Sequence, residues 1–203
     1  MLSEAQRDHL TSSGFVLLGP ILDGARIAQA QSLISELLAM EREELPVHGG
    51  STLHLQRNLL GAAPVFDAIL TPQLLAAVEH VVGPKAVAAR MHYRAPLPGY
   101  GAQMLHNDFG APVTSEPFQV ATAILALVDF TKNNGPTRLI PGSHRLPKIQ
   151  TLVTPDAEYS GQTLVECPAG HAVVFNGHLW HSGTRNKASA PRHSLQITFS
   201  RAP

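Results

Sequence analysis

Two hydrophobic patterns divide the chain near residue 86. Before that point, apolar residues recur at helical spacing, as at Ile27, Ile34 and Leu38. After it, short alternating and β-branched segments are separated by clusters of Gly, Pro and Asn, a pattern typical of antiparallel strands. Helices first and strands afterwards predict an α+β fold in which the strands form a sandwich or a closed barrel.

Capping residues mark where the expected helices begin. Ser3 and Gln6 form a weak capping box in front of a short helix. Thr71 precedes Pro72, and proline is favoured at the first position of a helix. Four helices are therefore expected, beginning after Ser3, after Asp23, at Pro64 and after Thr71, the last three ending near Glu44, Leu70 and Gly83.

The expected strands are short, and one of them lies within the helical part. That strand is the apolar run 14–19, which is bounded by glycines, whereas 46–58 has no clear period and is expected to be loop with room for one strand. The whole chain, 1–203, is expected to form one domain, helical over about 1–85 and a barrel over about 86–203. The barrel strands are expected at 86–94, 118–130, 137–140, 163–166, 171–175 and 194–199.

Composition excludes several classes of protein. Lys and Arg number 15 and Asp and Glu number 15, so no global basic field favours nucleic-acid binding. The single cysteine, Cys167, excludes an internal disulfide and suits a reducing compartment. The polar start is no signal peptide, and apolar runs such as 123–128 are too short to span a bilayer. A cytoplasmic protein with no membrane or nucleic-acid partner is expected.

The candidate chemistry lies among the 11 histidines. His106 and Asp108 form a His-x-Asp triplet, and on a strand such residues face the same side. With His181 as a third ligand, they would form a two-histidine, one-carboxylate set. That set leaves metal positions open and suits iron(II) oxygen chemistry. The triplet alone also fits a loop histidine beside a turn-forming aspartate.

The segments around this triplet add a family resemblance. They are 129–144, which contains Asn-Gly-Pro-Thr and ends in Pro-Gly-Ser-His, and 169–181, which ends at His181 and is followed eleven residues later by Arg192. In this order they resemble the phytanoyl-CoA dioxygenase family of iron(II)- and 2-oxoglutarate-dependent oxygenases. The resemblance covers about residue 90 to the C-terminus and extends more weakly over the helical half.

The resemblance implies a double-stranded β-helix, a jelly-roll barrel of the cupin type with N-terminal flanking helices. It assigns the iron ligands to His106, Asp108 and His181, and the partner of the 2-oxoglutarate C5-carboxylate to Arg192. It implies a dioxygenase that uses Fe(II), 2-oxoglutarate and O₂ to hydroxylate or otherwise oxidise a small organic molecule, releasing succinate and CO₂. No catalytic side chain is needed beyond the metal ligands, and a homodimer is expected.

Other candidate site residues can each be interpreted in two ways. Gln103 and Thr137 resemble positions that hydrogen-bond the cosubstrate, but polar residues near strand ends are also common. Arg90 and Arg94 share a strand face with His92, and they either bind an anionic substrate group or line a wet end of the barrel. The candidate substrate contacts are Arg90, Arg94, Tyr100, Arg138 and Trp180, and the roles of His144, His171 and His178 stay open.

Departures from the family pattern leave the iron ligands intact. Leu105 stands where the family often has Trp, and His171 stands where it usually has Asp. Asp108 is present, whereas halogenating relatives have a small residue there, so hydroxylation is favoured. The rival interpretations are a jelly-roll barrel with another metal, acting as a hydrolase or isomerase, and a non-catalytic small-molecule-binding protein. Arg192 argues against the first rival and the intact ligand set against the second.

Overall fold

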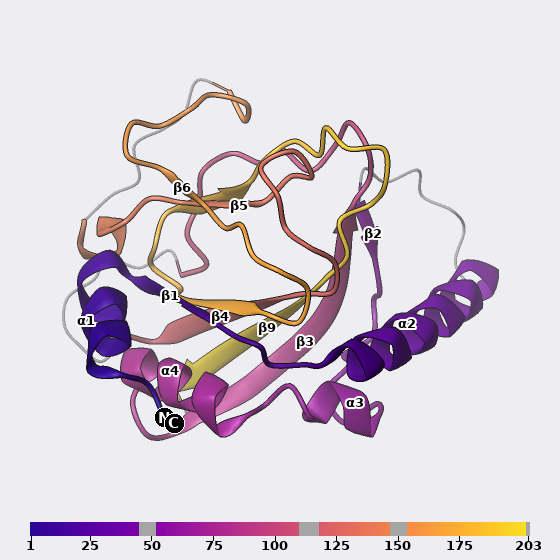
Figure 1. Cartoon of the computed structure of the whole chain (residues 1–203), viewed down its shortest axis with the longest axis horizontal. Coiled ribbons are helices and arrows are strands. Elements are labelled where there is room, and N and C mark those ends of the chain that lie inside the picture. The colour runs from indigo at the N-terminus through magenta and orange to yellow at the C-terminus, as the bar shows by residue number, and fades with distance from the viewer. Residues whose placement is uncertain (45–51, 110–117, 147–153, 202–203) are drawn as a thin grey trace.

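The computed structural model describes residues 1–44, 52–109, 118–146 and 154–201, and the statements below concern these ranges. Two antiparallel sheets face each other across the middle of the molecule (Figure 1). The small sheet has the order β6 (Thr163–Leu164), β5 (Thr137–Leu139) and β8 (His181–Gly183). The large sheet has the order β1 (Phe15–Leu18), β7 (Ala172–Asn176), β4 (Val120–Ala126), β9 (Ser194–Arg201), β3 (Ala86–Pro96) and β2 (Thr52–His54).

The helices begin where the capping residues predict. The Ser3 hydroxyl accepts from the Gln6 backbone N–H at 3.2 Å, and the Gln6 side chain accepts from the Ser3 N–H at 2.9 Å. Asp23 accepts from the Arg26 N–H at 2.9 Å, which fixes the start of the longest helix. The helices are α1 (Glu4–Ser13), α2 (Gly24–Glu44), α3 (Pro64–Asp67) and α4 (Pro72–Val82), with a short 3₁₀ turn at Ser143–Arg145.

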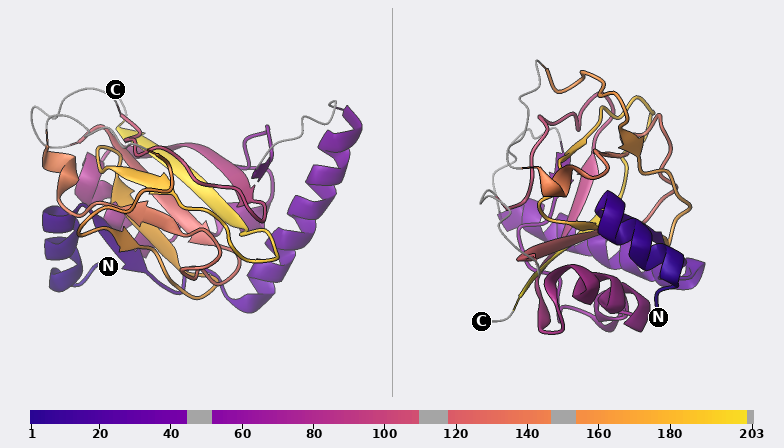
Figure 2. Two further views of the ribbon diagram at one scale, coloured as in Figure 1. Left: turned by 90° about the horizontal axis from the view of Figure 1, so that it is seen from above. Right: turned by 90° about the vertical axis from the view of Figure 1, so that its left-hand side faces the viewer.

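The large sheet has one apolar face, and its other face is apolar along β1 and β7 but polar along β3 and β9. Figures 1 and 2 show α3 and α4 on one side of it and the small sheet on the other. On the helix side, alternate residues such as Tyr93, Ile197 and Phe199 are almost fully buried. The intervening residues Arg94 and Gln196 face the space between the sheets, where they line a cavity. The fold is the expected double-stranded β-helix, with a packed core beneath it and, between the sheets, a second apolar cluster beside a polar cavity.

The elements differ from expectation in four places. The strand expected at 118–130 is only β4, because the chain turns away after Ala126 and Phe130 forms an isolated bridge with Cys167. The helix expected to reach Leu70 ends at Asp67. By contrast, β2 is the one strand for which the expected loop 46–58 left room, and residues 46–51 lie outside the described ranges. Strand β8 of the small sheet was not expected. In addition, β1 and β2 come from the helical half of the chain but join the large sheet, so the helical and barrel parts interleave.

Candidate functional site

Three expected ligands converge between the two sheets. His106 and His181 form an isolated antiparallel bridge, with backbone N–H···O distances of 2.9 and 2.8 Å. The Asp108 N–H donates to the Gly177 carbonyl at 2.8 Å, which holds the triplet against the segment leading into β8. One ligand atom from each of the three side chains lies within 4.8 Å of the others. This arrangement fits a single mononuclear metal ion.

Both imidazoles present the same nitrogen to this point. His106 Nδ1 lies 2.8 Å from the Met104 carbonyl oxygen, and His181 Nδ1 lies 2.9 Å from that of Leu179. Because a carbonyl only accepts hydrogen bonds, each Nδ1 carries the proton and each Nε2 keeps its lone pair for a metal. Burial lowers the pKa of His106, and the neighbouring His181 lowers it further, so the imidazole is neutral at neutral pH.

The carboxylate is held in its charged form. Burial alone would raise the pKa of Asp108, but His181 and a hydrogen bond from Thr122 bring that pKa below its ordinary value. Asp108 Oδ1 lies 3.4 Å from His181 Nε2, and Oδ2 accepts from the Thr122 hydroxyl at 2.6 Å. Thr122, fully buried on β4, therefore orients this ligand. Sequence reasoning missed it, because only the register of β4 brings it to Asp108.

Arg192 supplies an unpaired positive charge beside the ligands. Its residue is only 6% exposed, and its Nε and one terminal nitrogen are buried with no hydrogen-bond partner among the described residues. Its guanidinium stacks 4.4 Å from the centroid of the Phe130 ring. Burial lowers the pKa of Arg192 to about 10, with a further contribution from Arg94, and the group stays charged at neutral pH. Beyond this stacking, the buried nitrogens gain hydrogen-bond partners when an anionic ligand binds.

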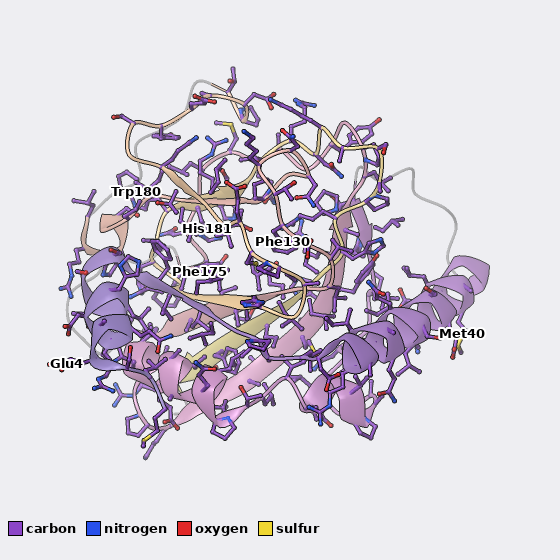
Figure 3. The ribbon with its side chains drawn as sticks, in the orientation of Figure 1. Glu4, Met40, Phe130, Phe175, Trp180 and His181 are labelled. Atoms are coloured by element: carbon purple, nitrogen blue, oxygen red, sulfur yellow. The ribbon has the colours of Figure 1, made fainter. Side chains whose placement is uncertain are left out.

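The two imidazoles and the Arg192 guanidinium line one cavity of about 170 Å³. Figure 3 shows Phe130, Phe175 and His181 between the two sheets, far from Met40 on α2. His106 and His181 lie in the wall of the cavity together with Arg192. Two imidazoles that could hold a metal and an unpaired guanidinium in one small cavity would suit a dicarboxylate such as 2-oxoglutarate, with Arg192 holding one of its carboxylates.

Gln103 and Thr137 also line this cavity. The Gln103 side-chain oxygen accepts from the Gly183 N–H at 3.0 Å, which leaves the amide NH₂ for a cavity ligand. A Cβ on Gly183 would lie 2.4 Å from the Gly101 carbonyl oxygen, so glycine permits this close approach of the two segments. Lining residues that sequence reasoning missed include Thr52, Ile124, Ser194 and Gln196.

Of the candidate substrate contacts, Arg94 lines the cavity and Arg90 lines a neighbouring groove. Arg138 points elsewhere: its guanidinium donates to the carbonyls of Ala157 and Pro155 and lies 5.9 Å from the Tyr159 ring centroid. Tyr100 is 53% exposed and Trp180 is 5% exposed, and neither lines the cavity.

The three histidines whose roles were open, His144, His171 and His178, are not among the described residues of the cavity wall. The His178 ring packs 5.1 Å from Phe109 and 5.3 Å from Phe118, measured between ring centroids. The His144 ring lies 5.6 Å from Phe118 in the same way. A Cβ on Gly19 would collide with the ring of His171. These contacts give the three histidines packing positions.

Comparison with known proteins identifies the family of the chain. The family model for phytanoyl-CoA dioxygenase (PhyH) matches residues 10–194. An uncharacterized protein of Mycobacterium tuberculosis, Rv1501, is 25% identical over 210 residues, which cover 97% of this chain and 74% of that protein. Dioxygenase trt7 of Aspergillus terreus is 36% identical over 115 residues, which cover 51% of this chain and 37% of the relative.

Solved structures share the fold. HygX from Streptomyces hygroscopicus, determined with nickel and 2-oxoglutarate, superposes with a TM-score of 0.80 at 16% identity and covers 100% of this chain and 88% of its own. The epimerase SnoN, determined with Fe³⁺, α-ketoglutarate and nogalamycin RO, superposes with a TM-score of 0.77 at 21% identity, covering 98% and 83%.

The fold is thus a jelly-roll, and its two histidines and one carboxylate form a group that could hold a metal ion. The chain belongs to the phytanoyl-CoA dioxygenase family, the iron(II)- and 2-oxoglutarate-dependent oxygenases, and it is an enzyme of that class. Within the described ranges, no helix is both long and apolar enough to cross a membrane.

Proposed function

We propose that this enzyme hydroxylates a small organic molecule and converts 2-oxoglutarate and O₂ to succinate and CO₂. The iron ligands in this proposal are His106, Asp108 and His181, and residues 1–203 act as one dioxygenase domain. Bound iron and 2-oxoglutarate together supply the oxidising power, and the protein orients the substrate and excludes water. The observation that carries the proposal is the buried, unpaired Arg192 guanidinium in the same cavity as the two imidazoles.

The role of each cavity residue follows from its chemistry. Arg192 presents a planar fork to the distal carboxylate of 2-oxoglutarate and offsets the free energy that burying this anion would otherwise cost. The Phe130 ring holds the guanidinium in place from one side. Thr137 and the free amide of Gln103 are the proposed hydrogen-bond donors to the rest of the cosubstrate.

The small-molecule substrate is supported by the solved structures. HygX has been determined with hygromycin B bound and SnoN with nogalamycin RO, both small molecules. Asp108 occupies the third ligand position, which favours hydroxylation over halogenation. Another similar structure is described as a carbocyclase, so one fold serves several oxidative outcomes.

The experiment is a screen for substrate-stimulated succinate release by the iron-loaded enzyme. We expect one class of small molecule to raise succinate release and to gain one oxygen atom in its mass spectrum. A product that has lost two hydrogens would mean that the reaction is desaturation or ring formation and not hydroxylation. An iron-loaded protein that neither binds nor turns over 2-oxoglutarate would overturn the proposal.

The proposal also places the enzyme in the cytoplasm as a homodimer. Its single cysteine suits a reducing compartment, and the dimer rests on the family resemblance. Sedimentation at micromolar concentration should show a dimer, and a single monomeric species would refute it.

A further inference from the structure

A polar strip runs along β3 on the face opposite the core. Arg90, His92 and Arg94 alternate with buried Met91 and Tyr93, so all three lie on the same side of the strand. Arg94 lines the iron cavity, and all three line a second groove, whose wall also includes His54 and Gln56. The two hollows therefore adjoin at the Arg94 side chain.

The iron cavity and the groove differ in volume, and this difference indicates different roles for them. The iron cavity holds about 170 Å³, less than the roughly 300–1,000 Å³ typical of pockets for drug-sized ligands. On the proposed function, 2-oxoglutarate occupies much of that space. The groove adds about 330 Å³ and is more open to solvent. A substrate therefore has room in the groove, with only its reacting end entering the cavity past Arg94.

The groove is cationic and uncompensated. Arg90 donates to the Gln56 carbonyl at 2.8 Å, whereas the Arg94 guanidinium makes no hydrogen bond or ion pair with any residue in the described ranges. No Asp or Glu is among the described lining residues. Burial lowers the pKa of His92 to about 4, and Arg94 and Arg90 contribute to the shift. His92 is thus neutral, and its buried Nδ1 has no partner within the described chain.

Arg94 and Arg192 also act on each other. Arg94 contributes to the lowered pKa of Arg192, so the two guanidiniums are close enough to repel. Two buried or half-buried cations in one cavity are most stable when two anions are bound. One anion is the cosubstrate carboxylate at Arg192, and Arg94 is the cation that lacks a second anion.

We propose that the substrate carries an oxyanion group, a carboxylate or a phosphate, which binds Arg94 with Arg90 in the groove. This inference rests on the proposed function and assigns the substrate class of the same site. The anion anchors one end of the substrate, and the remainder extends toward the metal ligands His106 and His181. Arg94 is then the residue that selects the substrate, while Arg192 selects the cosubstrate.

The test uses a panel of carboxylic acids and phosphate monoesters, each paired with its neutral methyl ester or alcohol. Succinate release is measured with Fe(II), 2-oxoglutarate and O₂, and binding of the panel members that raise it is measured by anaerobic calorimetry on the loaded enzyme. The variants are Arg94→Gln, which removes the charge, and Arg94→Lys, which keeps it. Arg26→Gln, on the exposed side of α2, is the matched control.

We expect the active compounds to be anions whose neutral counterparts neither bind nor raise succinate release. Arg94→Gln should weaken their binding by about tenfold to a hundredfold, the worth of a charge-assisted hydrogen bond, while 2-oxoglutarate affinity stays unchanged. Arg94→Lys should keep part of the binding, and Arg26→Gln should match the wild type. If Arg94→Gln does not fold, as judged by circular dichroism, Arg94→Lys decides: weaker anion binding at unchanged 2-oxoglutarate affinity supports the assignment.

Two results would overturn the inference and leave the proposed function standing. One is equal use of the neutral and anionic partners by the wild type. The other is a raised 2-oxoglutarate requirement in Arg94→Gln without an effect on the substrate, because Arg94 would then contact the cosubstrate. Failure of the wild type to bind iron and 2-oxoglutarate would instead overturn the proposed function itself.

Discussion

The two faces of the large sheet are made by the same strands, but along β3 and β9 one face carries apolar residues and the other carries polar residues. On the helix side, Tyr93, Ile197 and Phe199 are at most 1% exposed and belong to a continuous apolar core. On the inner side, Arg94 and Gln196 line the cavity. The first face contributes stability by removing apolar area from water, and the second holds polar groups that gain partners only when ligands bind. Substitutions on the two faces should therefore have different consequences.

The largest effect on activity should come from the metal ligands. Asp108→Ala removes the anionic ligand and leaves the two imidazoles to hold the metal. We expect the variant to fold but to lose succinate release by more than about a hundredfold, because even a residue that only supports a ligand is worth 10–100-fold. Thermal unfolding and steady-state succinate release measure the two halves of this prediction. Wild-type turnover in the variant would remove Asp108 from the site.

The opposite outcome is expected on the helix side. Phe199→Ala should lower the free energy of unfolding by about 3–5 kcal/mol, because it opens a cavity in the core. The fraction that remains folded should keep its affinity for iron and 2-oxoglutarate. Urea unfolding and equilibrium binding distinguish the two properties. A variant with full stability and impaired cosubstrate binding would contradict the division between the faces.

Arg192 is buried like the core residues, but we expect it to contribute to 2-oxoglutarate binding and not to the free energy of unfolding. Arg192→Ala should weaken 2-oxoglutarate binding by about 2–5 kcal/mol, while iron affinity changes little. The free energy of unfolding should stay the same or rise, since an unpaired buried charge is removed. Arg192→Lys should do less harm, because the charge remains while the fork is lost. Normal 2-oxoglutarate dependence in Arg192→Ala would place the carboxylate elsewhere.

The smallest expected effect concerns Thr122. Thr122→Val keeps the shape of the side chain but removes the hydroxyl that donates to Asp108 at 2.6 Å. Iron affinity should fall by about 10–100-fold, as is typical when a residue that orients a metal ligand is lost. Anaerobic iron titration measures this change, and Thr198→Val, a similar exchange on the neighbouring β9, is its control. Unchanged iron affinity would mean that the backbone alone positions Asp108.

Much of this site could be predicted from local sequence. His106, Asp108, His181 and Arg192 stand at motif spacings; the structure brings His106, His181 and Arg192 to one cavity and Asp108 to the two imidazoles. Thr122 could not be predicted, because its contact with Asp108 depends on how β4 is placed in the sheet. Phe130 was expected within a strand, but it lies beyond the end of β4, and its ring stacks against the Arg192 guanidinium.

Sequence position alone does not decide which candidates line the cavity, since Arg138, Tyr100 and Trp180 do not. Arg138 is adjacent to Thr137, but successive residues of β5 point to opposite sides, so only Thr137 reaches the cavity. Strand β8 was not expected either. It has only three residues, His181–Gly183, and its pairing with β5 is a long-range contact that no local pattern contains. Local capping chemistry, by contrast, placed the helix starts correctly.

The most direct test of the central claim is an anaerobic calorimetric titration with Fe(II), followed by 2-oxoglutarate, of the wild type, Asp108→Ala and Arg192→Ala. The account predicts that the wild type binds one iron per chain and then one 2-oxoglutarate. Asp108→Ala should lose both events, and Arg192→Ala should bind iron normally but 2-oxoglutarate only weakly. Tight 2-oxoglutarate binding by Arg192→Ala, or a wild type that binds no iron, would contradict it.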